Sequence, residues 1–366
     1  MILSLCLAHF LQNPQGSQEP LVQPLPAKQM DGLPQQEDLR YEGEVHFGAI
    51  RRLTNSGENA EGYFSWGGKQ ITYQAKFGGR ECDQIYTLDL LSGARKLVST
   101  GTGRTTCSFF MPGDNAVIFG STHAASDGCL EPPDYSMGYV WKIYPEFDLY
   151  VRDLETWELK PLAPSPGYDA EAVVSPDGKK IVYTSRREGD LDIYIMNTNG
   201  TGITKLTDQL GYDGGPFFSP DSKRIVYRSF YPKTKEETDR YLTLLDQDTI
   251  EPMALQLYVM DIDGSNKVQV TDNGAANFGP YFHPDNEHII YCSNQASRSG
   301  RDFDLFLIRD DGTDNERITY CPTFDGFPMF SHDGENLIFA SNRKNAKKGD
   351  TNLFMAEWLP DAQPKK

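Results

Sequence analysis

The sequence predicts an all-β fold, a six-bladed β-propeller of four-stranded antiparallel blades closed by the N-terminal strand joining the last blade. Three observations predict it: a turn motif that recurs six times, apolar strands on both sides of each copy, and a strand count that leaves the last unit one strand short. Self-similarity at a fixed period is the sequence signature of repeat architectures.

The turn motif is clearest in residues 172–183, where an apolar strand runs into Ser-Pro-Asp-Gly and a second apolar strand leaves it. Pro fixes φ and Gly accepts a positive φ, as a tight hairpin requires. The residue that opens the turn serves as an anchor position, and its six copies are Ser65, Met111, Ser175, Ser219, His283 and Ser331. Their spacings are 46, 64, 44, 64 and 48 residues. The repeat therefore has a period of about 44 residues, with about twenty extra residues inserted twice.

Each repeat unit contains four strands, named a to d in chain order. Strand a enters the turn, and strand b leaves it and carries an aromatic residue eight positions after the anchor, in the copies Tyr73, Phe119, Tyr183, Tyr227, Tyr291 and Phe339. Strand c begins with a polar–aliphatic–aromatic triplet, as in residues 192–194, and a short strand d follows, as in residues 205–207. Alternation at period two indicates strands with one buried face.

The strand count predicts how the ring closes. A d-type strand over residues 50–54 precedes the first strand a, whereas the sixth unit ends with its strand c near Trp358. If the first strand completes the last blade, no sheet edge is left free, which is how a closed β-architecture avoids edge pairing.

The run from Ser175 to Tyr183, followed by Asp192-Ile-Tyr-Ile-Met and Lys205-Leu-Thr, resembles the repeat of TolB-like six-bladed propellers. The resemblance covers about residues 48 to 359. It implies a periplasmic binding or scaffolding protein, and similar propellers also sit beside peptidase domains. A fold does not fix a function, so these remain expectations.

The domain organisation follows from composition. Residues 1–11 contain a short apolar run typical of the core of a secretory signal peptide, though no basic residue precedes it, so it would be a truncated leader. Residues 12–47 are rich in Gln and Pro and are predicted to be a flexible linker. Residues 48–360 form the propeller, and residues 361–366 form a tail. We therefore expect a periplasmic or secreted protein without a transmembrane segment.

The formal net charge of −17 excludes nucleic acid as an expected partner, because nucleic-acid binding needs a basic face. The four longest loops follow strand b, at about residues 121–147, 229–255, 293–303 and 341–351. Connections after strand b and after strand d lie on one face of a propeller, here called the long-loop face. Neutral loop growth would not prefer one face, so this preference predicts a binding surface.

Short oxygen-bearing side chains stand six residues before each anchor, at the mouth of the predicted central channel. They are Asn59, Thr105, Asp169, Asp213, Asn277 and Asp325, with Glu61 and Glu171 two residues further on in two units. Such a ring could hold a hard cation such as Ca²⁺, an amine or a basic peptide segment. The alternative is that these side chains cap their own loop backbone.

Three cysteines fall on the long-loop face of two neighbouring blades. Cys129 could pair with Cys82 or with Cys107 in an oxidising compartment, or all three could stay reduced. The spacing fits no standard zinc pattern.

Three functions stay open. The leading hypothesis is a non-catalytic propeller, monomeric, that binds a protein or peptide on the long-loop face and channel mouth. The second is a metal-dependent lyase or hydrolase at the channel mouth, although the sequence nominates no catalytic residue. The third is an accessory propeller that gates a separately encoded peptidase.

Overall fold

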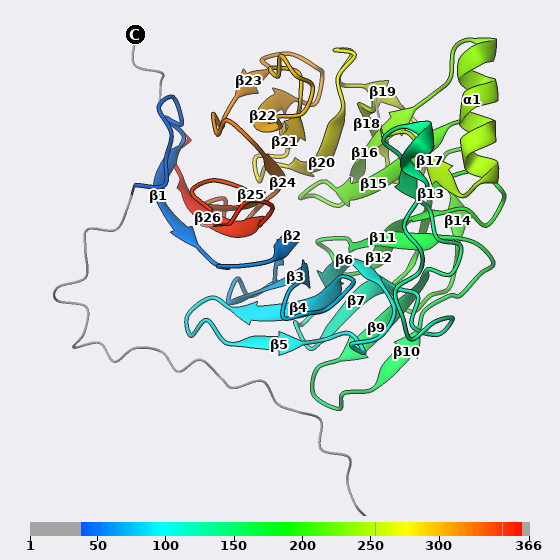
Figure 1. The fold of residues 1–366 in the computed structure, drawn as a ribbon, viewed down its shortest axis with the longest axis horizontal. Coiled ribbons are helices and arrows are strands. Elements are labelled where there is room, and N and C mark those ends of the chain that lie inside the picture. Colours follow the sequence, from blue (N-terminus) through cyan, green and yellow to red (C-terminus); the bar gives the residue numbers. More distant parts are fainter. Residues whose placement is uncertain (1–37, 253, 346, 361–366) are drawn as a thin grey trace, which may run out of the picture.

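Each predicted repeat unit forms one four-stranded antiparallel sheet, and six such sheets surround a central axis in the computed structural model (Figure 1). The structure describes residues 38–252, 254–345 and 347–360. The predicted signal segment 1–11, most of the linker 12–47 and the tail 361–366 lie outside these residues. The predicted fold class and blade number are confirmed.

Blades 1 to 3 follow one another along the chain. Blade 1 consists of β2 (Glu58–Phe64), β3 (Gln70–Lys76), β4 (Gln84–Asp89) and β5 (Arg95–Leu97). Blade 2 consists of β6 (Thr105–Phe110), β7 (Ala116–Ser121), β9 (Asp148–Asp153) and β10 (Leu159–Pro161). Blade 3 consists of β11 (Asp169–Val174), β12 (Lys180–Ser185), β13 (Asp192–Asn197) and β14 (Thr204–Lys205).

Blades 4 to 6 complete the ring. Blade 4 consists of β15 (Tyr212–Phe218), β16 (Arg224–Phe230), β18 (Gln256–Asp261) and β19 (Val268–Gln269). Blade 5 consists of β20 (Asn277–Phe282), β21 (His288–Ser293), β22 (Asp304–Arg309) and β23 (Glu316–Arg317). Blade 6 consists of β24 (Asp325–Phe330), β25 (Asn336–Ser341), β26 (Asn352–Trp358) and the N-terminal strand β1 (Phe47–Arg52).

The turn motif folds as its residues predict. Ser175 Oγ accepts the backbone N–H of Lys180 at 2.9 Å and donates to Asp177 at 2.7 Å, while Gly178 has a φ of 71°. The aromatic residue eight positions later, Tyr183, is fully buried and its ring packs 6.0 Å from that of Tyr194 in strand c. The turn and the aromatic pair together fix the register of each blade.

The ring closes through β1, which pairs with β26 so that Ile50 lies opposite Ala356 and Arg52 opposite Phe354. The chain before β1 also packs on blade 6, where Arg343 Nη1 donates to the carbonyl of Leu39 at 3.1 Å and Arg343 Nη2 to the carboxylate of Glu44 at 3.0 Å. Residues 38–46 fall within the predicted linker, and the structure corrects that boundary, because these residues pack on blade 6.

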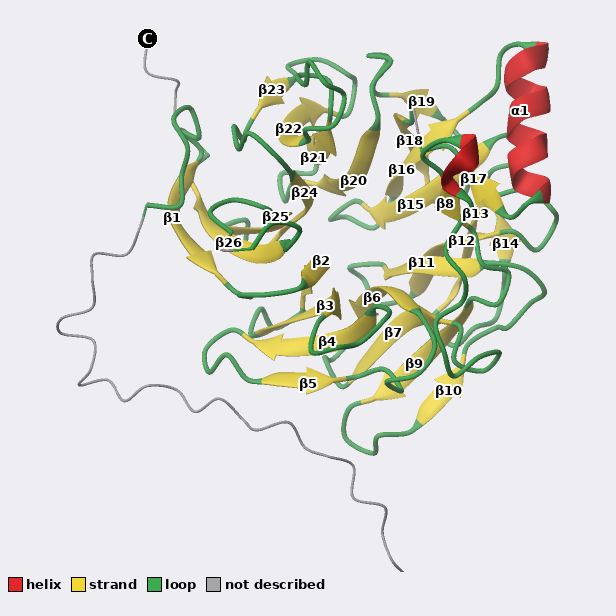
Figure 2. Ribbon diagram, in the orientation of Figure 1, coloured by secondary structure: helices red, strands yellow, loops and turns green. Residues whose placement is uncertain are grey.

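Two long insertions on the long-loop face form a further structure over blade 3. The blade 2 insertion contains a 3-10 turn η2 (Tyr135–Met137) and β8 (Trp141–Lys142), and the blade 4 insertion contains α1 (Lys235–Asp246) and β17 (Thr249–Ile250). β8 and β17 pair as a two-stranded sheet, and both helical segments lie on the same side of the ring (Figure 2). Among the described residues, no helix has the length and hydropathy needed to cross a membrane.

Candidate binding site at the channel mouth

The six side chains predicted to ring the channel mouth are buried, each with an exposed fraction of 1% or less. Each residue is the first or second of the innermost strand of its blade, and its backbone N–H donates to the carbonyl directly before strand c of the preceding blade. Asp213 donates in this way to Leu191 at 2.9 Å, and Asp169 to Phe147 at 2.9 Å. The six residues are Asn59, Thr105, Asp169, Asp213, Asn277 and Asp325.

Three of these side chains repeat the same contact. Thr105 Oγ1 donates to the carbonyl of Asp83 at 2.9 Å, Asn277 Nδ2 to that of Leu255 at 2.7 Å, and Asn59 Nδ2 to that of Thr351 at 2.8 Å. Buried polar groups need such partners. The structure therefore corrects the expected position: these side chains join neighbouring blades and do not form an open ring of oxygen ligands.

The three aspartates of this set each accept a bond from the side chain 18 residues later. Arg187 lies 3.5 Å from Asp169, and Arg343 lies 3.0 Å from Asp325. Asp213 instead accepts a hydrogen bond from the Tyr231 hydroxyl at 2.8 Å and another from Ser229, and burial raises its pKa to about 7. The recurring separation of 18 residues is a signal that the sequence contained.

The channel itself is lined two residues further along each innermost strand, where the pairing shifts register at a β-bulge and φ lies between 45° and 58°. The six bulge residues are Glu61, Cys107, Glu171, Gly215, Gly279 and Phe327. A Cβ at Gly215 would lie 2.7 Å from the Arg228 guanidinium, so a side chain there would have to displace Arg228. Glycine in two of six copies was the one sequence sign of this conformation.

The bulge layer brings together ionisable groups from four blades. Glu171 accepts bonds from Arg228, from the Thr184 hydroxyl at 2.6 Å and from the Gly215 N–H at 2.8 Å. Glu61 lies beside the Cys107 thiol, and its Oε2 has no hydrogen-bond partner. Burial raises the pKa of Glu61 to about 7 and also raises that of Cys107. Glu171 is thus paired with Arg228, whereas Glu61 titrates near neutrality.

Aromatic rings close the channel directly below this layer. Tyr63 packs 5.9 Å from Phe109 and 5.5 Å from Phe217, and Phe217 packs 5.5 Å from Tyr281. The cavity left among the bulge residues has a volume of about 20 Å³, roughly enough for one water molecule. A larger ligand therefore has access only to the mouth above.

A cavity of about 930 Å³, here called the basin, lies at the channel mouth. Its aromatic wall is continuous, since the ring of Trp141 lies 5.1 Å from Phe278, which lies 5.2 Å from Phe303. The other residues of this wall are Tyr139, Phe324 and Phe327, and the polar wall from blade 1 consists of Glu58, Asn59, Gln74 and Asp83. The volume and the mainly apolar lining are those of a ligand site.

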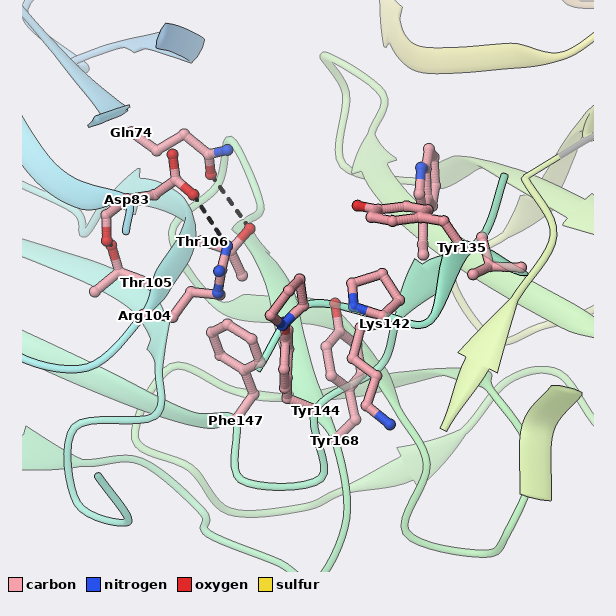
Figure 3. Close-up of a pocket in the computed structure, with 14 residues that line it drawn as sticks. Gln74, Asp83, Arg104, Thr105, Thr106, Tyr135, Lys142, Tyr144, Phe147 and Tyr168 are labelled. Atoms are coloured by element: carbon pink, nitrogen blue, oxygen red, sulfur yellow. Dashed lines mark hydrogen bonds and ion pairs between the residues drawn. The ribbon is translucent and has the colours of Figure 1, made fainter. Parts of the chain in front are cut away.

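A second cavity of about 290 Å³ adjoins the basin and shares Gln74, Asp83 and Trp141 with it (Figure 3). Gln74 Oε1 accepts the Thr106 hydroxyl at 3.2 Å, and Arg104 lies 3.4 Å from Asp83. These bonds fix the polar side chains between the two cavities.

The two insertions, residues 122–146 and 231–255, together form what we call the strap. A disulfide between Cys82 and Cys129 joins the strap to blade 1, and Asp248 pairs with Arg186 of blade 3. Cys107 and Cys292 are free thiols. Of the two partners considered for Cys129, the structure therefore pairs it with Cys82, and Cys107 lines the channel instead.

Within the described part of the chain, no group of three or more His, Cys, Asp or Glu side chains could hold a metal ion. The carboxylates of Asp169, Asp213 and Asp325 are each enclosed in their own blade, so they do not converge on one cation.

Comparison with known proteins supports the family resemblance. A family model described as the TolB beta propeller domain matches residues 132–234. No curated protein matches the chain. TolB from Acinetobacter baumannii is similar in structure, with a TM-score of 0.53 and 20% identity over 73% of this chain, which spans 56% of that TolB chain.

Two further solved structures share the fold. A protein assigned as TolB in Agrobacterium tumefaciens has a TM-score of 0.53 and 18% identity, covering 85% of this chain and 97% of that one. An oligogalacturonate lyase from Vibrio parahaemolyticus has a TM-score of 0.51 and 13% identity, covering 86% and 94%. At these identities the likeness shows the fold alone, because one propeller fold serves several functions. The chain is therefore a six-bladed β-propeller, and the TolB beta propeller family model matches its residues 132–234.

Proposed function

We propose that this protein is a non-catalytic binding propeller that engages a protein or peptide partner through the basin on its long-loop face. The observation that carries the proposal is the basin itself, an aromatic-walled cavity of about 930 Å³ at the mouth of a channel that is closed below. Interfaces draw most of their binding energy from a few aromatic or arginine side chains at the centre of the contact.

The rim supports a macromolecular partner. Tyr135 and Tyr139 of the strap are 60% and 64% exposed beside the cavities. Exposed tyrosines next to an apolar cavity supply rigid contact area for a partner's side chains.

We also infer that the protein is exported and acts as a monomer in the periplasm or outside the cell. The disulfide between Cys82 and Cys129 supports export, because structural disulfides persist in oxidising compartments. The family-model match also favours an envelope protein.

The test is capture of partners from a cell-envelope extract by the wild-type protein and by a basin variant, Tyr139→Ala with Phe324→Ala. Phe324 contacts Phe303 and Phe327 in the aromatic wall. We expect the basin variant to bind the captured partner at least about tenfold more weakly in a titration, as for loss of interface aromatic residues.

The matched control is Leu91→Ala. Leu91 is 97% exposed in the turn between β4 and β5, on the face opposite the basin. Equal binding by all three proteins would contradict the proposal, and so would a partner whose binding only Leu91→Ala removes.

A further inference from the structure

The long-loop face is electrically divided around the basin. The strap contains ten acidic and four basic residues, whereas the loops of blades 5 and 6, residues 294–303 and 342–351, contain six basic and two acidic residues. Of these six, Arg343 is buried and paired with Glu44 and Asp325, so five face outward. This basic side stands out in a chain whose formal net charge is −17. The two sides therefore present opposite charges to anything that enters the basin.

The basic side is available to a ligand. Arg298, Arg301, Lys347 and Lys348 are exposed, and none of them has an ion pair among the residues that the structure describes. The carboxylate nearest in sequence, Asp302, accepts hydroxyl bonds from Ser297 at 3.1 Å and Ser299 at 3.2 Å within its own loop.

Three of the strap's four cations, in contrast, are already paired. Lys142 lies 3.8 Å from Asp248, Arg240 lies 2.6 Å from Glu251, and Lys235 lies 2.5 Å from Asp239. The acidic excess of the strap thus remains after these internal pairs are made, while Arg298, Arg301, Lys347 and Lys348 form no ion pair among the described residues.

The basic loops also form part of the basin. Gly300, Arg301 and Phe303 of the blade 5 loop line it, as do Gly349 and Thr351 of the blade 6 loop. Cationic and aromatic groups therefore meet at one rim, within a few residues of each other.

Resting on the proposed function, we propose that the basin binds a peptide segment in which an apolar or aromatic side chain is flanked on one side by acidic residues. The apolar side chain fills the aromatic wall, and the acidic residues lie over the loops of blades 5 and 6. Complementary charge of this kind orients a ligand and excludes the reversed direction, in which acidic residues would face the strap.

An anionic oligosaccharide shares the carboxylate chemistry but fits the cavity less well. Uronic acid chains need many hydrogen-bonding groups along the site, whereas the wall between Trp141 and Phe324 consists of aromatic rings. The peptide is therefore the occupant that the lining favours.

The experiment selects ligands from a random dodecapeptide library displayed on phage, using the full-length wild-type protein. We expect enriched peptides to contain an aromatic or large apolar residue with acidic residues clustered to one side. The best peptide is then titrated calorimetrically against a loop variant, Arg298→Ser, Arg301→Ser, Lys347→Ser and Lys348→Ser. Loss of these cations should weaken binding at least about tenfold at low salt, with a smaller difference at high salt.

The control variant removes four exposed lysines elsewhere, Lys69→Ser, Lys160→Ser, Lys179→Ser and Lys223→Ser, so both variants have the same net charge. It should bind the peptide as the wild-type protein does, and thermal melting verifies that both variants are folded.

Each outcome decides a different claim. Enriched peptides without an acidic bias, or equal losses in both variants, would overturn this inference and leave the proposed function standing. Absence of any enriched peptide would overturn this inference, whereas the capture experiment decides the proposed function separately. Binding of an oligogalacturonate to the loop cations, with no competition from the selected peptides, would assign the basic loops to a sugar and also overturn the inference.

Discussion

Blades 3 and 6 place an arginine and an aspartate at the same two repeat positions, yet the two pairs have different surroundings. In blade 3, Arg187 lies 3.5 Å from Asp169 and its side chain is 16% exposed. In blade 6, Arg343 is fully buried and contacts both Asp325 and Glu44 at 3.0 Å. The difference arises from residues 38–46, which cover blade 6 and bring a second carboxylate to the arginine.

Blade 4 gives a third version of the same position. Tyr231 replaces the arginine there, so Asp213 is buried with hydroxyl partners and no cation among the described residues. The repeat therefore specifies where a buried carboxylate lies, whereas the residues around that carboxylate decide how its charge is compensated.

The sharpest test of this comparison is Arg343→Ala against Arg187→Ala. Removing Arg343 leaves two buried carboxylates without a counter-charge, which costs about 3–5 kcal/mol of unfolding free energy. Arg187→Ala should cost about 1 kcal/mol, because its pair is longer and reaches solvent. Chemical denaturation of both variants measures the two losses of unfolding free energy. Equal losses would show that residues 38–46, which cover Arg343, do not change the contribution of this ion pair to stability.

Asp213→Asn tests the blade that lacks the cation. The pKa of Asp213 is raised from 3.8 to about 7 by burial, so the folded protein holds this proton more tightly than the unfolded chain. The wild-type protein therefore loses stability as pH rises from about 4 to about 7, by about 2–4 kcal/mol from this group.

Asn carries no charge, so the stability of Asp213→Asn relative to the wild-type protein should increase over the same pH range and then level off. Thermal melts at pH 5 and pH 8 measure it. Asp325→Asn is the control, because the partner of Asp325 is an arginine. If Asp213→Asn instead destabilises the protein more at pH 8 than at pH 5, the Asp213 carboxylate is ionised and stabilised in the folded protein.

Glu44→Gln should have a smaller effect than Arg343→Ala. The substitution keeps the shape of the side chain and leaves Asp325 to pair with Arg343, so we expect a loss of about 1–3 kcal/mol. Asp38→Asn removes a carboxylate from the same segment, but Asp38 is largely exposed, with 63% of its side chain accessible, and should change stability little. If the Glu44→Gln protein is as stable as the Asp38→Asn protein, the negative charge of Glu44 is not needed to hold residues 38–46 on blade 6.

The repeat signals predicted the six blades and their closure because both depend on short-range chemistry. The Ser-Pro-Asp-Gly turns and the buried aromatic residues of strand b impose one register, and the missing last strand indicated β1. In four of the six blades, the residue that lines the channel lies two positions after the predicted one. The channel is lined by the β-bulge of strand a, and the sequence pattern did not reveal that bulge. Bulge residues such as Cys107 and Phe327 give no sign in their identity that φ is positive.

The aromatic wall of the basin could not be predicted from the sequence. Trp141 lies in an insertion that has no repeat register, and its neighbour Phe278 lies 137 positions away along the chain. The position of the strap over blade 3 likewise depends on pairing between β8 and β17, two strands of two residues each. Such short strands have no periodic pattern of their own.

The closure of blade 6 also constrains how the protein is made. Thr54 bonds to Asn352, 298 residues later in the chain, and at typical elongation rates this interval takes about 15–60 s of synthesis. Five blades can assemble as the ribosome delivers them, but β1 has no partner until the last strand appears. During that time it is an unpaired edge able to pair with other nascent chains. Aggregation is therefore most dangerous during translation, and β1 is the strand that a chaperone would need to shield.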